Sequence, residues 1–328
     1  MTFYSNPVFD TDFPDPMILH APDGWYYGYA TQTIVAGRTL NIQVARSRDL
    51  IHWTRLGDAL PVKPEWACHT QCFWGPHVLA ADGRYYLYYS ASPDAGDGLC
   101  LAVAVAAAPA GPFVDSGAPL RCGPGFANID PMAFDDPATG QRLLYWGSGF
   151  GPIYVQPLAP DRVHFQPGTE PLPLLYPHGT RGYERLIEAA YVVARDGYYY
   201  LFYSGDNCCG DNAHYAVLVA RSENATGPFE PRAVALGTPD SAVLQRSARW
   251  DAPGHNSVIR DAAGDDWIVY HAIDRNRRCL DETIAGDRAV RRILLIDRLV
   301  YQKGWPMVAG GIPSATEQAG PVLDLPKR

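Results

Sequence analysis

The sequence predicts an all-β fold, a five-bladed β-propeller, on three observations. It contains 20 Tyr, 8 Trp, 31 Gly and 29 Pro, a composition typical of many short strands joined by tight turns. A turn followed by an aromatic strand recurs five times along its 328 residues. No helical period separates the copies, so the repeats are those of small sheets arranged around one axis.

Each copy of the repeat predicts a hairpin turn inside one blade. The copies start at Asp23, Asp82, Thr139, Asp196 and Gly264, and continue GWYYGYAT, GRYYLYYSA, GQRLLYWGSG, GYYYLFYSG and DDWIVYHAI. Asp-Gly between apolar segments is a strong hairpin signal. The copies lie roughly 60 residues apart, which leaves room for about four short strands in each unit. We therefore expect a single catalytic propeller domain that spans residues 1–328.

The repeats also predict which residues meet at the centre. The first strand of each blade lines the channel of a propeller, so residues at one offset before each copy should converge. Eight or nine residues before the copies stand Asp15, Trp74, Asp130, Glu188 and His255. An Asp before Pro commonly starts a turn, which is the alternative for Asp15 and Asp130. The shared offset favours a functional set, because a charge removed from water needs a partner or a task.

Three carboxyls at nearly the same position of the repeat suit the hydrolysis of a glycosidic bond. One carboxylic acid must protonate the leaving oxygen, and a second carboxylate must act at the anomeric carbon. A third, held ionised nearby, would raise the pKa of the acid and keep it protonated near neutral pH. Asp15, Asp130 and Glu188, one from each of three blades, fit this scheme.

A family resemblance makes the scheme specific. The segments at residues 6–18, 73–78, 128–136, 186–204 and 253–259 together resemble glycoside hydrolase family 43 in order and spacing. The resemblance implies an inverting enzyme for α-L-arabinofuranosyl or β-D-xylosyl linkages, or an endo-1,5-α-L-arabinanase. It places the general base on Asp15, the pKa-modulating aspartate on Asp130 and the general acid on Glu188. Two departures, Gly75 for the usual Ala and Ala190 for the frequent Pro, are expected to be minor.

The same resemblance suggests substrate-binding residues. Trp74 is expected to stack on a sugar face, with simple channel packing as the alternative. His255 matches the family's Gly-His-x-Ser motif, which implies a Ca²⁺ ion in the central channel that the histidine meets through water. Arg292 aligns with an arginine that contacts substrate in relatives, and Arg288 and Arg291 compete for that assignment.

Composition excludes several partners. A net charge of -8 and a pI near 5.5 leave no basic stripe for nucleic acid and favour a neutral oligosaccharide or polysaccharide. The apolar run at residues 99–108 is shorter than the roughly 20 residues of a membrane span. Residues 1–10 lack the pattern of a signal peptide, so we expect a cytoplasmic location. The oligomeric state stays open.

The cysteines predict no complete disulfide framework, because there are seven. The spacing of Cys68 and Cys72 is not that of a zinc or redox site. Adjacent Cys208 and Cys209 could form a vicinal disulfide or remain two thiols. The loop at residues 208–214 and the stretch at 176–185 could both shape a pocket.

Two other functions fit the sequence less well. A retaining fructan-active or sialidase-like propeller would show Asn-Asp-Pro and Arg-Asp-Pro motifs or an arginine triad, whereas Phe-Pro-Asp-Pro starts at Phe13 and Asn-Ile-Asp-Pro at Asn128. A non-catalytic glycan-binding propeller has no need of three carboxyls. Retention of all three therefore favours an enzyme.

Overall fold

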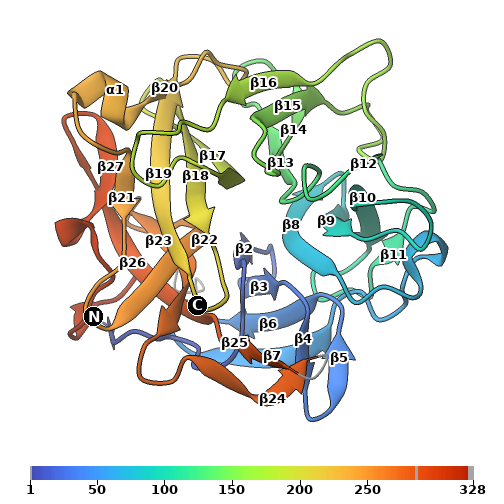
Figure 1. Ribbon diagram of the computed structural model, residues 1–328, viewed down its shortest axis with the longest axis horizontal. Coiled ribbons are helices and arrows are strands. Elements are labelled where there is room, and N and C mark those ends of the chain that lie inside the picture. Colours follow the sequence, from blue (N-terminus) through green and yellow to red (C-terminus); the bar gives the residue numbers. More distant parts are fainter. Residues whose placement is uncertain (1, 285–286, 324–328) are drawn as a thin grey trace.

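Five antiparallel sheets follow one another in chain order around a central channel (Figure 1), in the computed structural model that describes residues 2–284 and 287–323. The first strand of each sheet lies innermost, and later strands lie farther out. The predicted five-bladed β-propeller is thus confirmed. No helix among the described residues is long and apolar enough to cross a membrane.

Blade I consists of β2 (Met17–His20), β3 (Tyr26–Ala30), β6 (Gln43–Ser47) and β7 (Trp53–Asp58). Blade II consists of β8 (Phe73–Ala81), β9 (Arg84–Ala91), β10 (Leu99–Ala106), β11 (Val114–Asp115) and β12 (Arg121–Gly123). Blade III consists of β13 (Met132–Asp135), β14 (Arg142–Trp146), β15 (Ile153–Pro157) and β16 (Leu172–Leu175). Blade IV consists of β17 (Ile187–Arg195), β18 (Tyr198–Asn207), β19 (His214–Ser222), β20 (Glu230–Pro231) and β21 (Ala242–Leu244). Blade V consists of β22 (Trp250–Arg260), β23 (Asp266–Asp274), β26 (Ile293–Gln302) and β27 (Trp305–Val308).

The remaining elements lie outside the blades. They are the strand pairs β1 (Phe3–Tyr4) with β28 (Gln318–Ala319), β4 (Thr33–Val35) with β5 (Arg38–Leu40), and β24 (Cys279–Ile284) with β25 (Asp287–Val290), together with α1 (Arg232–Leu236) and the 3₁₀ turns η1 (Glu65–Ala67) and η2 (Ala309–Gly311).

The predicted hairpin turn joins the first and second strands of a blade. Asp82 and Gly83, between β8 and β9, have φ angles of 52° and 71°. Asp196 and Gly197, between β17 and β18, have φ angles of 51° and 82°. Two left-handed residues in a two-residue loop form the turn that matches the twist of paired strands. The aromatic strand of each repeat is therefore the second strand of its blade.

Second strands are almost wholly apolar because both of their faces are buried. In β9, Leu87 and Tyr89 pack toward blade I, whereas Tyr86 and Tyr88 pack toward blade III. Among the described residues, one such hydrophobic core fills the space between each pair of adjacent blades. Alternate side chains of a strand point to opposite faces, so a strand buried on both faces loses its polar alternation.

The N-terminal segment closes the ring by running along blade V. Strands β1 and β28 pair, the Val8 N–H group donates to the Leu294 carbonyl at 3.0 Å, and the Phe13 N–H group donates to the Arg292 carbonyl at 2.7 Å. This closure brings the segment that carries Asp15 against the segment that carries Arg292.

The disulfide framework is incomplete, as the odd number of cysteines predicts. Cys100 and Cys122, directly opposite each other on β10 and β12, form a disulfide. Cys68, Cys72 and Cys279 are free thiols. The remaining pair lies in the candidate active site.

Candidate active site

The six residues singled out from the sequence meet at one end of the central channel. Asp15, Trp74, Asp130, Glu188, His255 and Arg292 all line one cavity of about 330 Å³. Four of them lie at the start of an innermost strand or just before it, His255 lies in the middle of β22, and the arginine directly precedes β26. The blades therefore supply the carboxyls from three directions around one space.

In every blade the backbone of the innermost strand, or of the segment just before it, bends into the left-handed region at one residue. The bent residues are Asp15, Gly75, Asp130, Ala189 and His255, with φ angles of 57°, 52°, 57°, 56° and 45°. In blades II, IV and V the strand pairing also shifts register here, as in the β-bulges that re-aim side chains near active sites. Such a bend costs a non-glycine residue about 1 to 2 kcal/mol, so neighbouring groups must hold it.

The five residues found from the repeats occupy two adjacent positions relative to the bend. Asp15, Asp130 and His255 occupy the bend, whereas Trp74 and Glu188 stand one residue before it. In a regular strand adjacent residues face opposite sides. The bend is what allows both positions to reach the same cavity.

A polar collar, formed by Thr31, Ser90, Ser204 and His271, holds four of the bends from the preceding blade. The backbone N–H groups of Asp15, Gly75, Asp130 and His255 donate to His271 Nδ1 (3.0 Å), Thr31 Oγ1 (2.8 Å), Ser90 Oγ (3.2 Å) and Ser204 Oγ (2.9 Å), respectively. In blade IV the acceptor is Asp130 itself, whose Oδ2 accepts the Ala189 N–H group at 3.1 Å. These hydrogen bonds offset the cost of the bends and position the carboxyls.

None of the collar residues is among the candidates drawn from the sequence, although the repeats contain their signal. Each of the four lies at or near the end of the aromatic signature of its blade, where a polar residue interrupts an apolar strand. Ser148 takes that place in blade III, and its hydroxyl donates to Glu188 Oε2 at 2.7 Å. A polar residue at the same position of each repeat, inside a buried strand, is the pattern that identifies the polar collar.

Asp15 is a buried carboxylate surrounded by donors and cations. Its Oδ2 accepts the Thr31 hydroxyl at 2.6 Å, and its Oδ1 lies 2.8 Å from Arg292 Nη1. Oδ1 also lies 3.3 Å from Nδ1 of both His255 and His271. Burial alone would raise the pKa of Asp15, but Arg292 and then His255 outweigh it and hold this pKa well below its usual range. Asp15 is therefore ionised at neutral pH.

Glu188 has the opposite environment. Its Oε1 accepts the Tyr215 hydroxyl at 2.7 Å, opposite the bond from Ser148 to Oε2. Burial raises the pKa of Glu188 by more than these two hydrogen bonds lower it. Two carboxyls in one site with pKa values displaced in opposite directions are the arrangement expected of a base and an acid.

Asp130 and His255 lie between these two carboxyls. His255 Nδ1 is 3.9 Å from Asp130 Oδ2. Burial raises the pKa of Asp130 to about 7, with His255 opposing the shift and Glu188 and Asp15 adding to it. Although burial lowers the pKa of His255, Asp130 and Asp15 raise it to about 8. His255 is thus a cation at neutral pH.

Gly75 is not a minor departure from the family pattern. Its φ angle is 52°, and a Cβ atom added there would clash with Asp130 Oδ1. The glycine therefore allows the Asp130 carboxylate to lie directly against the backbone of blade II.

Of the two candidate arginines whose side chains the structure describes, Arg292 is the one that reaches a carboxyl, that of Asp15. Arg291 instead forms an ion pair with Asp10. The side chain of Arg288 lies outside the described residues.

The rest of the cavity wall is largely apolar. Its further lining residues are Thr31, Phe126, Ile129, Leu186, Asn207, Cys208 and Cys209. Cys208 and Cys209 form a disulfide. Of the two segments expected to shape the pocket, the one at 208–214 contributes these cysteines, whereas none of residues 176–185, all of which are described, lines it.

Comparison with known proteins agrees with this geometry. The family model for Glycosyl hydrolases family 43 matches residues 4–306. The chain belongs to this family. It is therefore a glycoside hydrolase, and family 43 is a family of inverting enzymes.

Named relatives and a solved structure support the membership along the chain. An extracellular exo-α-(1→5)-L-arabinofuranosidase of Cellvibrio japonicus is 27% identical, over 90% of this chain and 86% of its own. An extracellular endo-α-(1→5)-L-arabinanase of Bacillus subtilis is 25% identical, over 89% of this chain and 86% of its own. The crystal structure of a thermostable family-43 glycoside hydrolase has a TM-score of 0.77 at 27% identity and covers 98% of this chain and 100% of its own.

The expected cytoplasmic location is wrong. Both relatives carry the word extracellular in their names. The disulfide between Cys100 and Cys122 agrees with this correction, because such bonds persist in oxidising surroundings.

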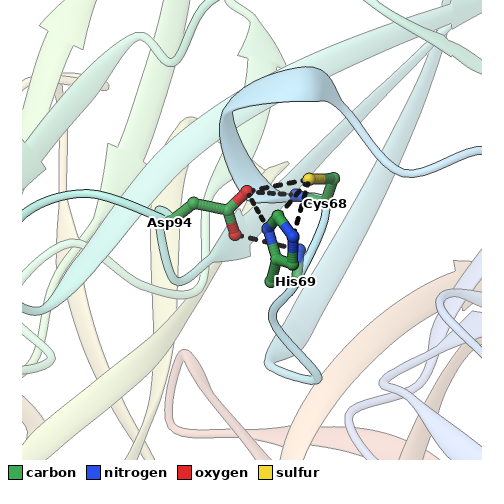
Figure 2. Close-up of side chains that lie close together, drawn as sticks. All are labelled: Cys68, His69 and Asp94. Atoms are coloured by element: carbon green, nitrogen blue, oxygen red, sulfur yellow. Dashed lines mark hydrogen bonds and ion pairs between the residues drawn. The ribbon is translucent and has the colours of Figure 1, made fainter.

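This family-43 enzyme also has, outside the cavity, a group of side chains of the types that bind metal ions (Figure 2). Cys68 Sγ lies 3.0 Å from both His69 Nδ1 and Asp94 Oδ2, and the latter two atoms are 2.9 Å apart. Asp94 also accepts the backbone N–H groups of Cys68 and His69, both at 2.9 Å. All three residues are exposed. Asp94 thus ties the segment before β8 to the loop between β9 and β10.

The family resemblance implies a calcium ion beside His255, where the channel also holds a small space. His77, Asp130, His255, Asn256 and Ser257 are among the residues around a space of about 10 Å³, which holds about one water molecule. The side chains of Asn256 and Ser257 make no hydrogen bond to other described residues. Calcium takes six to eight oxygen ligands, and the ion stays a prediction.

Proposed function

We propose that the enzyme releases terminal α-L-arabinofuranosyl residues from arabino-oligosaccharides. Asp15 is the general base, Glu188 the general acid, and Asp130 the group that adjusts the pKa of Glu188. The observation that carries this assignment is the opposite displacement of two pKa values in one cavity. An inverting glycosidase needs one carboxyl ionised and one protonated at the same pH.

The chemistry follows from these protonation states. The Asp15 carboxylate takes a proton from a water molecule as its oxygen attacks the anomeric carbon. Glu188 gives its proton to the glycosidic oxygen as the bond to that oxygen breaks. The sugar leaves with inverted configuration, Asp15 holds the proton of the water, and both carboxyls return to their starting states by exchange with solvent.

The other lining residues have positioning and binding roles in this proposal. Arg292 keeps Asp15 ionised and oriented through their 2.8 Å contact. His255, a cation between two carboxyls, limits their mutual repulsion. Trp74 offers an aromatic face to the C–H groups of a sugar ring.

The cavity suits cleavage from a chain end. A volume of about 330 Å³ lies at the lower end of the roughly 300 to 1,000 Å³ typical of small-molecule pockets. Phe126 and the disulfide of Cys208 and Cys209 form part of its wall. The relative from Cellvibrio japonicus is named for exo action on an α-(1→5)-L-arabinofuranosyl linkage, which supports the same choice over an endo-1,5-α-L-arabinanase.

A substrate panel tests the proposal. The enzyme should hydrolyse p-nitrophenyl α-L-arabinofuranoside faster than p-nitrophenyl β-D-xyloside, and should release arabinose from debranched arabinan with little early loss of viscosity. A faster xyloside reaction would make it a β-D-xylosidase, and an early fall in viscosity would make it an endo-arabinanase. Glycan binding without hydrolysis of any of the three would indicate a non-catalytic propeller.

We also propose that the enzyme acts outside the cell, because two relatives are named extracellular enzymes and because the chain has two disulfides. Activity should therefore appear in the culture medium of the organism that encodes the chain, and retention of all activity in the cell lysate would contradict this.

Activity should not depend on calcium, given the small space of the channel beside His255. Dialysis against EDTA should leave kcat unchanged relative to the same enzyme in CaCl₂. A loss of activity that calcium restores would show that the enzyme needs the ion.

A further inference from the structure

The disulfide between Cys208 and Cys209 lines the catalytic cavity, and the reaction as described does not use it. It lies in the loop between β18 and β19, on the blade that carries Glu188. Both cysteines are half-buried, so part of each side chain faces the cavity and part packs against the protein.

Cys208 packs close to the residue that holds the acid. It contacts a small cluster that contains Tyr215, and the Tyr215 hydroxyl donates to Glu188 Oε1 at 2.7 Å. Asp15 is held instead by Thr31 of blade I and Arg292 of blade V. The disulfide is therefore on the acid's side of the cavity. Because the acid protonates the oxygen that joins two sugars, this side faces the sugar of the leaving group.

The loop with the disulfide is fixed to the next blade. Arg278 Nη2 donates to the carbonyls of Gly210 and Asp211 at 3.0 and 3.3 Å, and its Nη1 lies 3.2 Å from Asp251 Oδ2. A wall held in this way is ready for a ligand before binding, which reduces the entropic cost of association.

The chemistry of a disulfide suits the C–H face of a sugar ring. Its two sulfurs are polarisable and carry no hydrogen-bond donor, whereas reduced cysteines carry two S–H groups. We propose that the Cys208–Cys209 disulfide is the binding wall for the sugar on the leaving-group side, and that it sets a preference for a sugar over a small leaving group. This inference rests on the proposed role of Glu188 as the acid.

Two substrates with the same bond and different leaving groups test the inference. α-1,5-L-Arabinobiose has a sugar as its leaving group, whereas methyl α-L-arabinofuranoside has a leaving group without a ring. In the double variant Cys208→Ala/Cys209→Ala, kcat/KM for arabinobiose should fall about tenfold, mainly through KM, as for loss of one apolar contact. The loss for the methyl glycoside should be several times smaller. The matched control Cys100→Ala/Cys122→Ala removes the disulfide of blade II and should change neither value.

Reduction of the wild-type enzyme provides a second route that does not require the variant to fold. Tris(2-carboxyethyl)phosphine transfers two electrons to the disulfide, and water supplies the phosphine oxide oxygen and the protons of two thiols. Reduced wild type should reproduce the selective loss on arabinobiose, and the Cys208→Ala/Cys209→Ala variant should not respond.

Equal losses on the two substrates, or no loss on arabinobiose, would overturn the leaving-group wall while the wild-type activity upheld the proposed function. A wild-type enzyme inactive on both substrates would overturn the proposed function and the wall with it.

Discussion

Replacement of Tyr215 with Phe should shift the basic limb of the pH–activity profile to higher pH. The Tyr215 hydroxyl donates a 2.7 Å hydrogen bond to Glu188 Oε1, and both residues are buried. A donor to a carboxylate stabilises the ionised form, so its removal favours the protonated form and raises the pKa. Because Glu188 is the proposed acid, the variant should stay correctly protonated to higher pH.

The size of the shift follows from the two donors on Glu188. A hydrogen bond to a charged group contributes about 1.5 to 3 kcal/mol, and about 1.4 kcal/mol corresponds to one pKa unit. The Ser148 hydroxyl remains on Oε2 at 2.7 Å and retains part of the stabilisation. We therefore expect an upward shift of about one unit. Loss of one of two orienting contacts should also lower kcat at the optimum about tenfold.

The profile of kcat/KM against pH reports the pKa values of the free enzyme, and p-nitrophenyl α-L-arabinofuranoside is a convenient substrate. Ser148→Ala removes the other donor and is the matched variant, which should shift the limb in the same direction. Circular dichroism across the pH range controls for unfolding. A basic limb that stays in place or moves to lower pH in Tyr215→Phe would refute the reasoning.

Four further predictions follow from the site and its surroundings. Glu188→Gln should slow hydrolysis of arabino-oligosaccharides about 10² to 10⁴-fold and largely spare an aryl glycoside, whereas Asp15→Asn should suppress both; the reverse pattern in a comparison of the two substrates would exchange the roles. Asp130→Asn should move the basic limb of the kcat/KM profile downward, because a lost neighbouring negative charge lets Glu188 ionise sooner, and an upward shift would contradict this. Gly75→Ala should lower kcat about 10²-fold at an unchanged circular dichroism spectrum, because the new Cβ displaces the Asp130 carboxylate; full activity would show that this carboxylate need not lie there. Stability should fall as the pH drops below 6.5, because burial lowers the pKa of His77 from 6.5 to about 3 and the unfolded chain takes up the proton first. Scanning calorimetry of His77→Gln should show a smaller decline in stability than wild type, and an equal decline would rule out this residue as a cause.

The sequence by itself determined the number of blades and the position of the site residues relative to the repeats. The Asp-Gly turns and the apolar strands that follow them are local features, since turn conformation depends on the residues of the turn and burial on both faces requires apolar side chains throughout. A fixed offset from these repeats was enough to locate Asp15, Asp130 and His255 at the channel.

Only the tertiary structure decided which partners give these residues their chemistry. The choice of Arg292 depends on closure of the ring, which places it 2.8 Å from Asp15 although 277 positions separate the two in the chain. The same holds for Tyr215 on Glu188 and for the disulfide of Cys208 and Cys209 in the cavity wall. The pKa of each carboxyl is set by burial and by charges from other blades. Since those distances exist only in the assembled propeller, the division of the carboxyls into base and acid could not be derived from residue spacing.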